Sequence, residues 1–235
     1  MMKNTVIILG TAHLGTTAGK RSPEGKFREA EYSRKLVSAV RDILTSKGYA
    51  VQIDWLPLDP PTGVAHANNA IQTNKEISYR ISRVNRLCER YGKDNCIYVS
   101  VHVNAAGSGT CWSNAGGWAC YTSKGETKSD SLAECLYDAA EKHLVNYARI
   151  METGKVNGSY GKSQKHIRRD MSDGDRDFEE SFSVLTKTRC VAVLTENLFQ
   201  DNKCDVAYLQ SKEGFDVIVN IHVEAIVNWI FRFGN

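Results

Sequence analysis

Two histidines and two glutamates are the side chains of this sequence whose types and positions could do hydrolytic chemistry. His13 and His102 lie at or just beyond the ends of apolar runs, Glu29 follows a glycine-rich stretch, and Glu196 ends a later apolar run. Two imidazoles and one carboxylate can bind a tetrahedral zinc ion and leave one position open for water. A second carboxylate that does not bind the metal can take a proton from that water and pass it to a leaving nitrogen.

Alternating strands and helices are expected to bring these side chains together. Four short apolar runs bounded by glycine or polar residues predict strands at residues 6–9, 51–55, 96–103 and 190–194. Apolar stripes with helical spacing predict helices at residues 29–47, 75–92, 129–149 and 213–232. A polar segment at residues 153–183, first basic and then acidic, is predicted to be a loop.

This order predicts an α/β fold, a single three-layer domain with a mixed, mostly parallel sheet flanked by helices. Ligands of such sheets bind at the carboxyl ends of the strands, where His13, His102 and Glu196 are expected to lie. Taken singly, each histidine could instead satisfy a local hydrogen bond, so the prediction depends on their convergence.

Helical geometry separates the two glutamates at the start of the first predicted helix. At about 100° per residue, Glu29 falls within roughly 40° of the apolar stripe that contains Leu36 and Val40, whereas Val40 lies opposite Glu31. Glu29 is therefore expected to face the core and Glu31 to face water. A buried carboxylate is costly unless it is paired or binds a cation. The alternative role for Glu29 is to complement the helix dipole, which does not require burial.

Three motifs in this sequence resemble those of the zinc-dependent N-acetylmuramoyl-L-alanine amidases of the Amidase_3 type. Residues 12–25 followed by Glu29 resemble the opening of that family, with Ala12 and Leu14 where glycines usually flank the first histidine. Residues 100–105 resemble its second histidine motif, and residues 194–199, with Asn202 and Asp205 after them, resemble the segment that carries its catalytic glutamate.

The resemblance implies a zinc amidase or exopeptidase-like fold, one zinc ion per chain, and a peptidoglycan substrate. His13, Glu29 and His102 would bind the metal, and Glu196 would act as general base and acid. The bond cleaved would be the amide between N-acetylmuramic acid and the L-alanine of the stem peptide. Two alternatives stay open: a zinc exopeptidase that acts on peptides, and a wall-binding module without a metal or catalysis.

Three further residues are assigned to substrate binding. Asn104 belongs to the second histidine motif. Arg168 could bind a stem-peptide carboxylate through two hydrogen bonds, or lie in a solvated basic loop. Trp112 could offer a flat face to a sugar or peptide, or simply pack.

Composition restricts the partners and the location. The 235 residues carry a net charge of +3, too little and too evenly spread for a nucleic-acid partner, and no linker divides them, so residues 1–235 are expected to form one catalytic domain. The apolar run at residues 6–9 is too short for a signal peptide, and no membrane span is expected. We therefore expect synthesis in the cytoplasm and action at the cell wall or periplasm. No feature indicates an oligomeric state.

The seven cysteines are expected to lie outside the chemistry, since they form no Cys-x-x-Cys pair. In an oxidising compartment, Cys111 and Cys120 are the pair that could form a disulfide across the glycine-rich loop.

Overall fold

The apolar runs at residues 6–9 and 96–103 form two neighbouring central strands. In the computed structural model, which describes residues 4–107 and 109–234, they belong to a six-stranded sheet of order β2-β1-β3-β6-β4-β5. The first four strands of this order are parallel, β4 is antiparallel to β6, and β5 is parallel to β4. The strands are β1 (Val6–Thr11), β2 (Ala50–Ile53), β3 (Cys96–Asn104), β4 (Ala119–Thr122), β5 (Phe178–Glu179) and β6 (Val191–Phe199).

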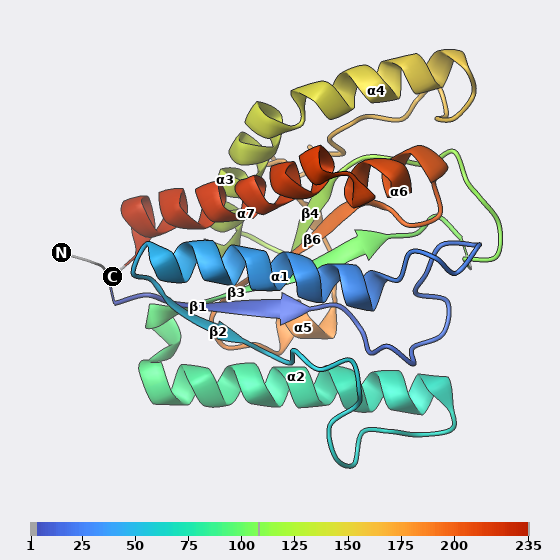
Figure 1. The fold of residues 1–235 in the computed structure, drawn as a ribbon. Helices are drawn as coiled ribbons and strands as arrows, with labels where there is room; N and C mark the ends of the chain where they lie inside the picture. The colour runs from blue at the N-terminus through green and yellow to red at the C-terminus, as the bar shows by residue number, and fades with distance from the viewer. Residues whose placement is uncertain (1–3, 108, 235) are drawn as a thin grey trace.

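Helices cover both faces of this sheet (Figure 1). One face carries α1 (Glu29–Ser46), α3 (Lys128–His143), α4 (Val145–Val156), α6 (Lys203–Gln210) and α7 (Lys212–Phe233). The other face carries α2 (Asn69–Tyr91) and the short α5 (Ser183–Thr186). A 3-10 turn, η1 (Lys93–Asn95), leads into β3. The predicted fold class, a three-layer α/β domain with a mixed and mostly parallel sheet, is confirmed.

Side-chain alternation divides the core between the two faces of the sheet. Ile7 and Leu9 of β1 pack into the large apolar cluster under α1, α3 and α7, whereas Ile8 packs with Val84 and Cys88 of α2. Successive side chains of a strand point to opposite faces, so β1, β3 and β6 each supply both clusters. The same alternation places His102 on the α2 face of β3, with Tyr98.

Two predictions of secondary structure were wrong. The helix expected at residues 129–149 is two helices, α3 and α4, that meet at the fully buried Leu144. The apolar spacing continues across this junction and therefore did not reveal it. The segment at residues 153–183, expected to be a loop, contains the end of α4 and the strand β5. This strand is too short to show the alternation of apolar and polar residues that would predict it.

Helix α7 is long and apolar enough to span a membrane by length and composition alone. In this fold, side chains such as Ile218, Ile226 and Trp229 are buried in the main core beneath the helix. Packing therefore accounts for its apolar composition.

All seven cysteines are free thiols in this structure. Cys120 is buried in β4 whereas Cys111 is exposed, so the suggested Cys111–Cys120 disulfide is not formed.

Candidate metal centre and active site

Three side chains of the predicted site come from the carboxyl ends of neighbouring strands. His13 follows β1, and His102 lies near the end of β3, in register with Glu196 on β6. Glu29 is the first residue of α1, whose N-terminus lies beside these strand ends. Glu29 is 1% exposed whereas Glu31 is exposed, as the helical phase predicted.

His13, Glu29 and His102 form a cluster that could hold a metal ion. One ligand atom from each of the three lies within 4.8 Å of the others. His102 Nδ1 is 3.1 Å from Glu29 Oε1, and His13 Nε2 is 3.7 Å from Glu29 Oε2. The two imidazole rings meet edge to face with centroids 5.2 Å apart. Two ring nitrogens and a carboxylate are donors that suit zinc.

His13 and Glu29 are held in the protonation states that a metal requires. Burial lowers the pKa of His13 to about 3, so its imidazole is neutral at neutral pH. Burial alone would raise the pKa of Glu29, but His13 and His102 outweigh it and the pKa falls to about 2. Glu29 Oε2 is buried and has no hydrogen-bond partner within residues 4–107 and 109–234. A buried carboxylate oxygen without a partner, close to an imidazole nitrogen, fits a metal ligand.

Two arginines hold the turn that presents His13. His13 has a positive φ of 40°, which is uncommon for a residue other than glycine. Its carbonyl oxygen accepts hydrogen bonds from Arg34 Nη2 at 2.8 Å and from Arg80 Nη2 at 3.1 Å. Ala12 and Leu14 are buried on either side of it. These contacts stabilise the turn without the flanking glycines.

Arg80 is itself part of a buried ion-pair network that the sequence analysis missed. Its guanidinium lies 2.7 Å from Asp54 Oδ2 and 3.1 Å from Glu76 Oε1. Asp54 also accepts a hydrogen bond from the backbone N–H of Thr11 at the end of β1. The i,i+4 spacing of Glu76 and Arg80 on α2 was the one local signal of this network.

Glu196 faces the same pocket as the two histidines. The pocket has a volume of about 250 Å³ and is lined by Thr11, His13, Lys20, Glu76, Ile77, Arg80, Ser100, His102, Phe182, Ser183, Val184, Leu194 and Glu196. Burial and the negative charge of Glu29 raise the pKa of Glu196 well above its ordinary value, while Lys20 and Arg168 oppose this increase. In the described part of the chain, Glu196 Oε2 has no hydrogen-bond partner. Glu196 is therefore a carboxyl group with a free oxygen beside the candidate metal ligands.

Residues after Glu196 fix the end of β6. Asn197 Nδ2 donates to the carbonyl oxygen of His102, 2.9 Å away, and Asn197 Oδ1 accepts from the indole of Trp118. Asp205 accepts hydrogen bonds from the backbone N–H of Phe199 and from the hydroxyl of Tyr147. Polar contacts thus join the strand that carries Glu196 to the strand that carries His102.

The three residues assigned to substrate binding lie in different surroundings. Arg168 is near enough to Glu196 to lower its pKa, and its guanidinium packs over the rings of Phe178 and Phe199 instead of projecting into solvent. Asn104 ends β3, where its Oδ1 accepts from the backbone N–H of Ala105. Neither side chain lines the 250 Å³ pocket.

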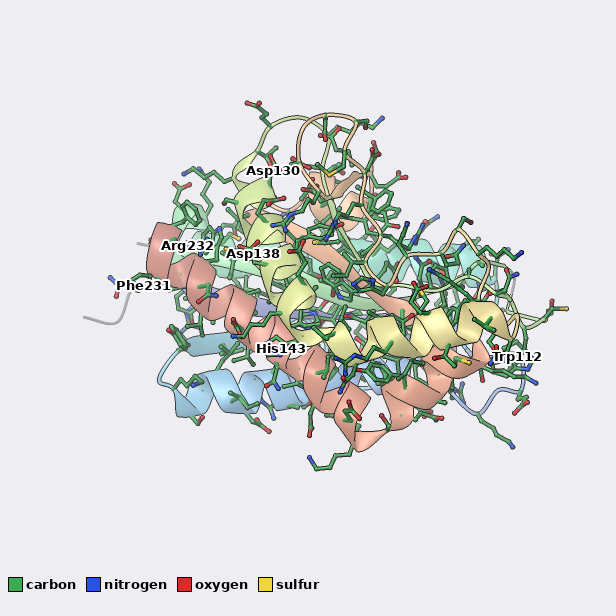
Figure 2. All side chains as sticks on the ribbon, turned by 90° about the horizontal axis from the view of Figure 1, so that it is seen from above. Trp112, Asp130, Asp138, His143, Phe231 and Arg232 are labelled. Carbon is green, nitrogen blue, oxygen red and sulfur yellow. The ribbon has the colours of Figure 1, made fainter. Side chains whose placement is uncertain are left out.

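Trp112 lies outside the pocket that contains Glu196. It packs beside the end of α4 (Figure 2) and lines a separate pocket of about 430 Å³ with residues such as Ser159 and Lys203. The ammonium group of Lys203 lies 5.5 Å from a ring centroid of Trp112. The structure thus does not bring Trp112 to the histidines.

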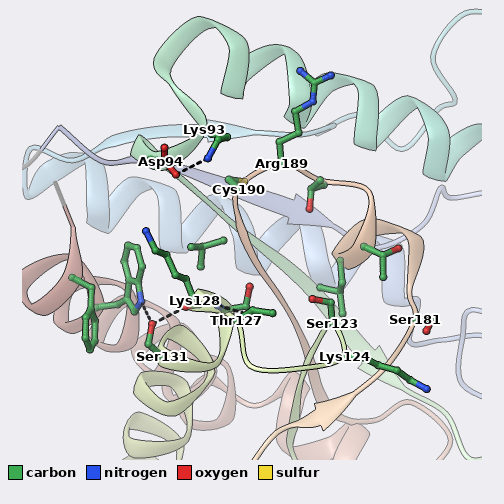
Figure 3. Close-up of a pocket in the computed structure, with 17 residues that line it drawn as sticks. Lys93, Asp94, Ser123, Lys124, Thr127, Lys128, Ser131, Ser181, Arg189 and Cys190 are labelled. Carbon is green, nitrogen blue, oxygen red and sulfur yellow. Dashed lines mark hydrogen bonds and ion pairs between the residues drawn. The ribbon is translucent and has the colours of Figure 1, made fainter.

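A larger cavity of about 620 Å³ lies at the opposite end of the sheet (Figure 3). It is lined partly by basic side chains, among them Lys93, Lys124, Lys128 and Arg189. None of the two histidines and two glutamates of the predicted site contributes to it. Size alone is thus a poor guide to the chemistry of this protein.

The fold and this cluster together define an α/β protein with a candidate metal-dependent hydrolase site at the carboxyl ends of its strands. The Amidase_3 family model, described as N-acetylmuramoyl-L-alanine amidase, matches residues 7–228. The chain belongs to this family.

Solved structures of known amidases resemble this chain in fold. The chain is similar to the CwlD amidase of Clostridioides difficile, solved in complex with the GerS lipoprotein, with a TM-score of 0.68 and 15% identity over 97% of this chain and 98% of that one. It is also similar to the catalytic domain of CwlV, an N-acetylmuramoyl-L-alanine amidase from Bacillus (Paenibacillus) polymyxa, with a TM-score of 0.66 and 15% identity over 97% and 98% of the two chains.

A curated relative is the endolysin of Bacillus phage SPP1. It is 24% identical over 224 residues, which make up 94% of this chain. The chain spans 64% of the length of that relative.

Proposed function

We propose that this protein is a zinc-dependent N-acetylmuramoyl-L-alanine amidase that cleaves the amide between N-acetylmuramic acid and L-alanine in peptidoglycan. The observation that carries the proposal is the convergence of His13, Glu29, His102 and Glu196 at one pocket within the residues that match the family. The product would be a stem peptide with a free L-alanine amino group.

His13, Glu29 and His102 would hold the metal. Bound zinc supplies a Lewis acid that polarises a carbonyl group and acidifies water. Glu29 adds a negative charge to the donor set, and its Oε1 accepts from the backbone N–H of Val103 at 3.2 Å, which fixes the carboxylate. Because the imidazole of His13 is already neutral, metal binding displaces no proton from it at neutral pH.

Glu196 would move the proton. Its carboxylate accepts a proton from the attacking water while the water oxygen forms a bond to the carbonyl carbon. The same carboxyl group then donates this proton to the leaving nitrogen as the carbon–nitrogen bond breaks, which yields a carboxylic acid and a free amine. The raised pKa of Glu196 makes its carboxylate a stronger base toward water, and the carboxyl group can then pass the proton to the leaving nitrogen.

The proposed place of action is the cell wall or periplasm, after synthesis in the cytoplasm. This follows from the substrate and not from the ends of the chain. The similarity to a phage endolysin supports an enzyme of wall lysis.

Digestion of purified peptidoglycan tests the activity. Mass spectrometry should find stem peptides that begin with L-alanine, and Glu196→Gln should lower the rate by at least about a hundredfold. Shortened stems still attached to sugar would instead identify an exopeptidase. A Glu196→Gln variant that binds zinc and digests at the wild-type rate would refute the catalytic assignment.

Metal analysis tests the zinc centre. Protein purified without added zinc should contain about one zinc ion per chain, and Glu29→Gln should lose it. Glu31→Gln is the matched control, because it removes the same charge from the same helical turn on the exposed side. A wild-type protein that binds no zinc and digests no wall would be a binding module.

A further inference from the structure

Three aspartates form a second cluster of metal-binding side chains away from the catalytic pocket. Asp130 lies in the first turn of α3, and Asp175 and Asp177 lie in the segment that leads into β5. One carboxylate oxygen from each lies within 4.8 Å of the others. Figure 2 labels Asp130 at the start of α3. None of the three lines the pocket that contains Glu196.

Asp177 is the buried member of this cluster. Its side chain is 1% exposed, and its Oδ2 accepts a hydrogen bond from Thr122 Oγ1 at 2.5 Å. Its Oδ1 is buried and has no hydrogen-bond partner among the residues that the structure describes. Such an oxygen is costly to bury, and in a cluster of carboxylates a cation is the partner that would satisfy it.

No side chain of the described residues neutralises the cluster by an ion pair. Arg176 lies between Asp175 and Asp177 in the chain, but its guanidinium turns to α3, where it binds Glu134 at 2.5 Å, Asp138 at 2.7 Å and Glu141 at 2.8 Å. The guanidinium of Arg176 is therefore paired with acidic side chains of α3 and not with Asp175 or Asp177.

Burial and neighbouring carboxylates raise the pKa of two members of the cluster, Asp177 and Asp175. Burial, together with the neighbouring Asp175 and Asp130, raises the pKa of Asp177 to about 7. The pKa of Asp175 is also raised, by burial and by the charges of Asp173 and Asp130. Either a proton or a cation relieves such crowding.

We propose that Asp130, Asp175 and Asp177 bind a calcium ion. All donors are carboxylate oxygens, which hard cations prefer over the nitrogen and sulfur donors that suit zinc. Two oxygens bound to one calcium at about 2.4 Å lie at most about 4.8 Å apart, and the three carboxylate oxygens meet this limit. Magnesium generally keeps its waters and takes only one or two carboxylates.

The spacing of acidic residues in the chain supports this choice. Asp173, Asp175 and Asp177 alternate with other residues, and this spacing is typical of the first half of calcium-binding loops. Calcium would fasten the segment before β5 to α3 and, through Thr122, to β4. Phe178 follows Asp177 directly and packs against Arg168, so the ion would stabilise the segment that places Arg168 near Glu196.

Terbium luminescence on the zinc-loaded protein tests the site, because Tb³⁺ replaces Ca²⁺ and is sensitised by nearby aromatic rings. Calcium should displace Tb³⁺, and magnesium should not at equal concentration. Saturating calcium should raise the melting temperature by roughly 5–10 °C. Absence of any calcium effect up to about 10 mM, above the weakest affinities of extracellular calcium modules, would overturn the proposal.

Variants separate this site from the catalytic one. Asp177→Asn should weaken Tb³⁺ binding by at least about tenfold. If this variant does not fold, Asp175→Asn, which alters a partly exposed side chain, tests the same site. Glu180→Gln is the control: it removes an exposed carboxylate three residues from Asp177 and should bind as the wild type does. Equal binding by Asp175→Asn and the wild type would refute the assignment. Zinc content stays at the wild-type level in all of them if the two sites are independent.

Discussion

At the scale of single residues, neighbouring charges shift the pKa values of the two glutamates of the site in opposite directions. The pKa of Glu29 is lowered because His13 and His102 outweigh the cost of burial. The pKa of Glu196 is raised because burial and Glu29 act in the same direction. Two carboxyl groups whose pKa values are pushed apart can divide the work of binding a metal and moving a proton.

The charge of Arg168 should affect the pH below which activity is lost. Glu196 must lose its proton to act as a base, and the positive charge of Arg168 lowers its pKa. Arg168→Met should therefore move the acidic limb of a kcat–pH profile upward, on the order of half a pH unit. Arg169→Met, which alters an arginine paired with Glu141, is the control and should leave the limb in place. An unshifted limb in Arg168→Met would mean that Arg168 does not act on the base.

At the scale of elements, the site depends on a turn that three segments stabilise together. The turn follows β1, Arg34 comes from α1 and Arg80 comes from α2. Arg34 also donates to the carbonyl oxygens of Leu56 and Pro57, so it ties the turn to the segment after β2.

Loss of Arg34 should loosen His13. Arg34→Met removes the donors that hold the carbonyl oxygens of Ala12 and His13, and the residue at a positive φ then loses part of its support. Zinc affinity should fall roughly tenfold, as it does when groups that orient a metal ligand are removed. Chelator competition measures this effect. Arg41→Met, on the exposed side of α1, should retain full affinity; equal affinities in the two variants would contradict the role of Arg34.

At the scale of the whole molecule, a buried histidine links stability to pH. Burial lowers the pKa of His222 in α7 to about 4, and its Nε2 lies 2.9 Å from Thr195 Oγ1 in β6. The ordinary value is about 6.5, so the unfolded chain binds a proton at a pH where the folded protein does not. This contribution to stability is complete above about pH 6.5 and is lost as the pH falls toward 4.

His222→Leu should isolate that contribution. The variant cannot take up the proton, so its free energy of unfolding should fall less than that of the wild type between pH 6.5 and 4, by about 2–3 kcal/mol. Denaturant unfolding of both proteins at a series of pH values measures the difference. The opposite effect of Asp205, whose raised pKa of about 7 costs stability as the pH rises, is present in both proteins and cancels. A difference that stays constant with pH would refute the linkage.

The local sequence predicted the position of a side chain correctly where helical periodicity or the end of a strand fixes that position. The phase of α1 predicted that Glu29 is buried and Glu31 exposed, and the ends of the apolar runs predicted that His13, His102 and Glu196 converge. It failed at Leu144, where a helix breaks without a change of period, and it did not place Trp112, whose position depends on the path of a glycine-rich loop.

The sequence by itself determined the donor types, the main strands of the core and the helical face of Glu29, because these depend on residue chemistry and on periods of two or 3.6 residues. Tertiary structure alone decided which distant charges meet. Arg34 and Arg80 share the carbonyl oxygen of His13, and Asp130 meets Asp177, which lies 47 positions later in the chain. Such contacts depend on the conformation of the loops that connect helices and strands, and the packing of the whole chain determines these conformations.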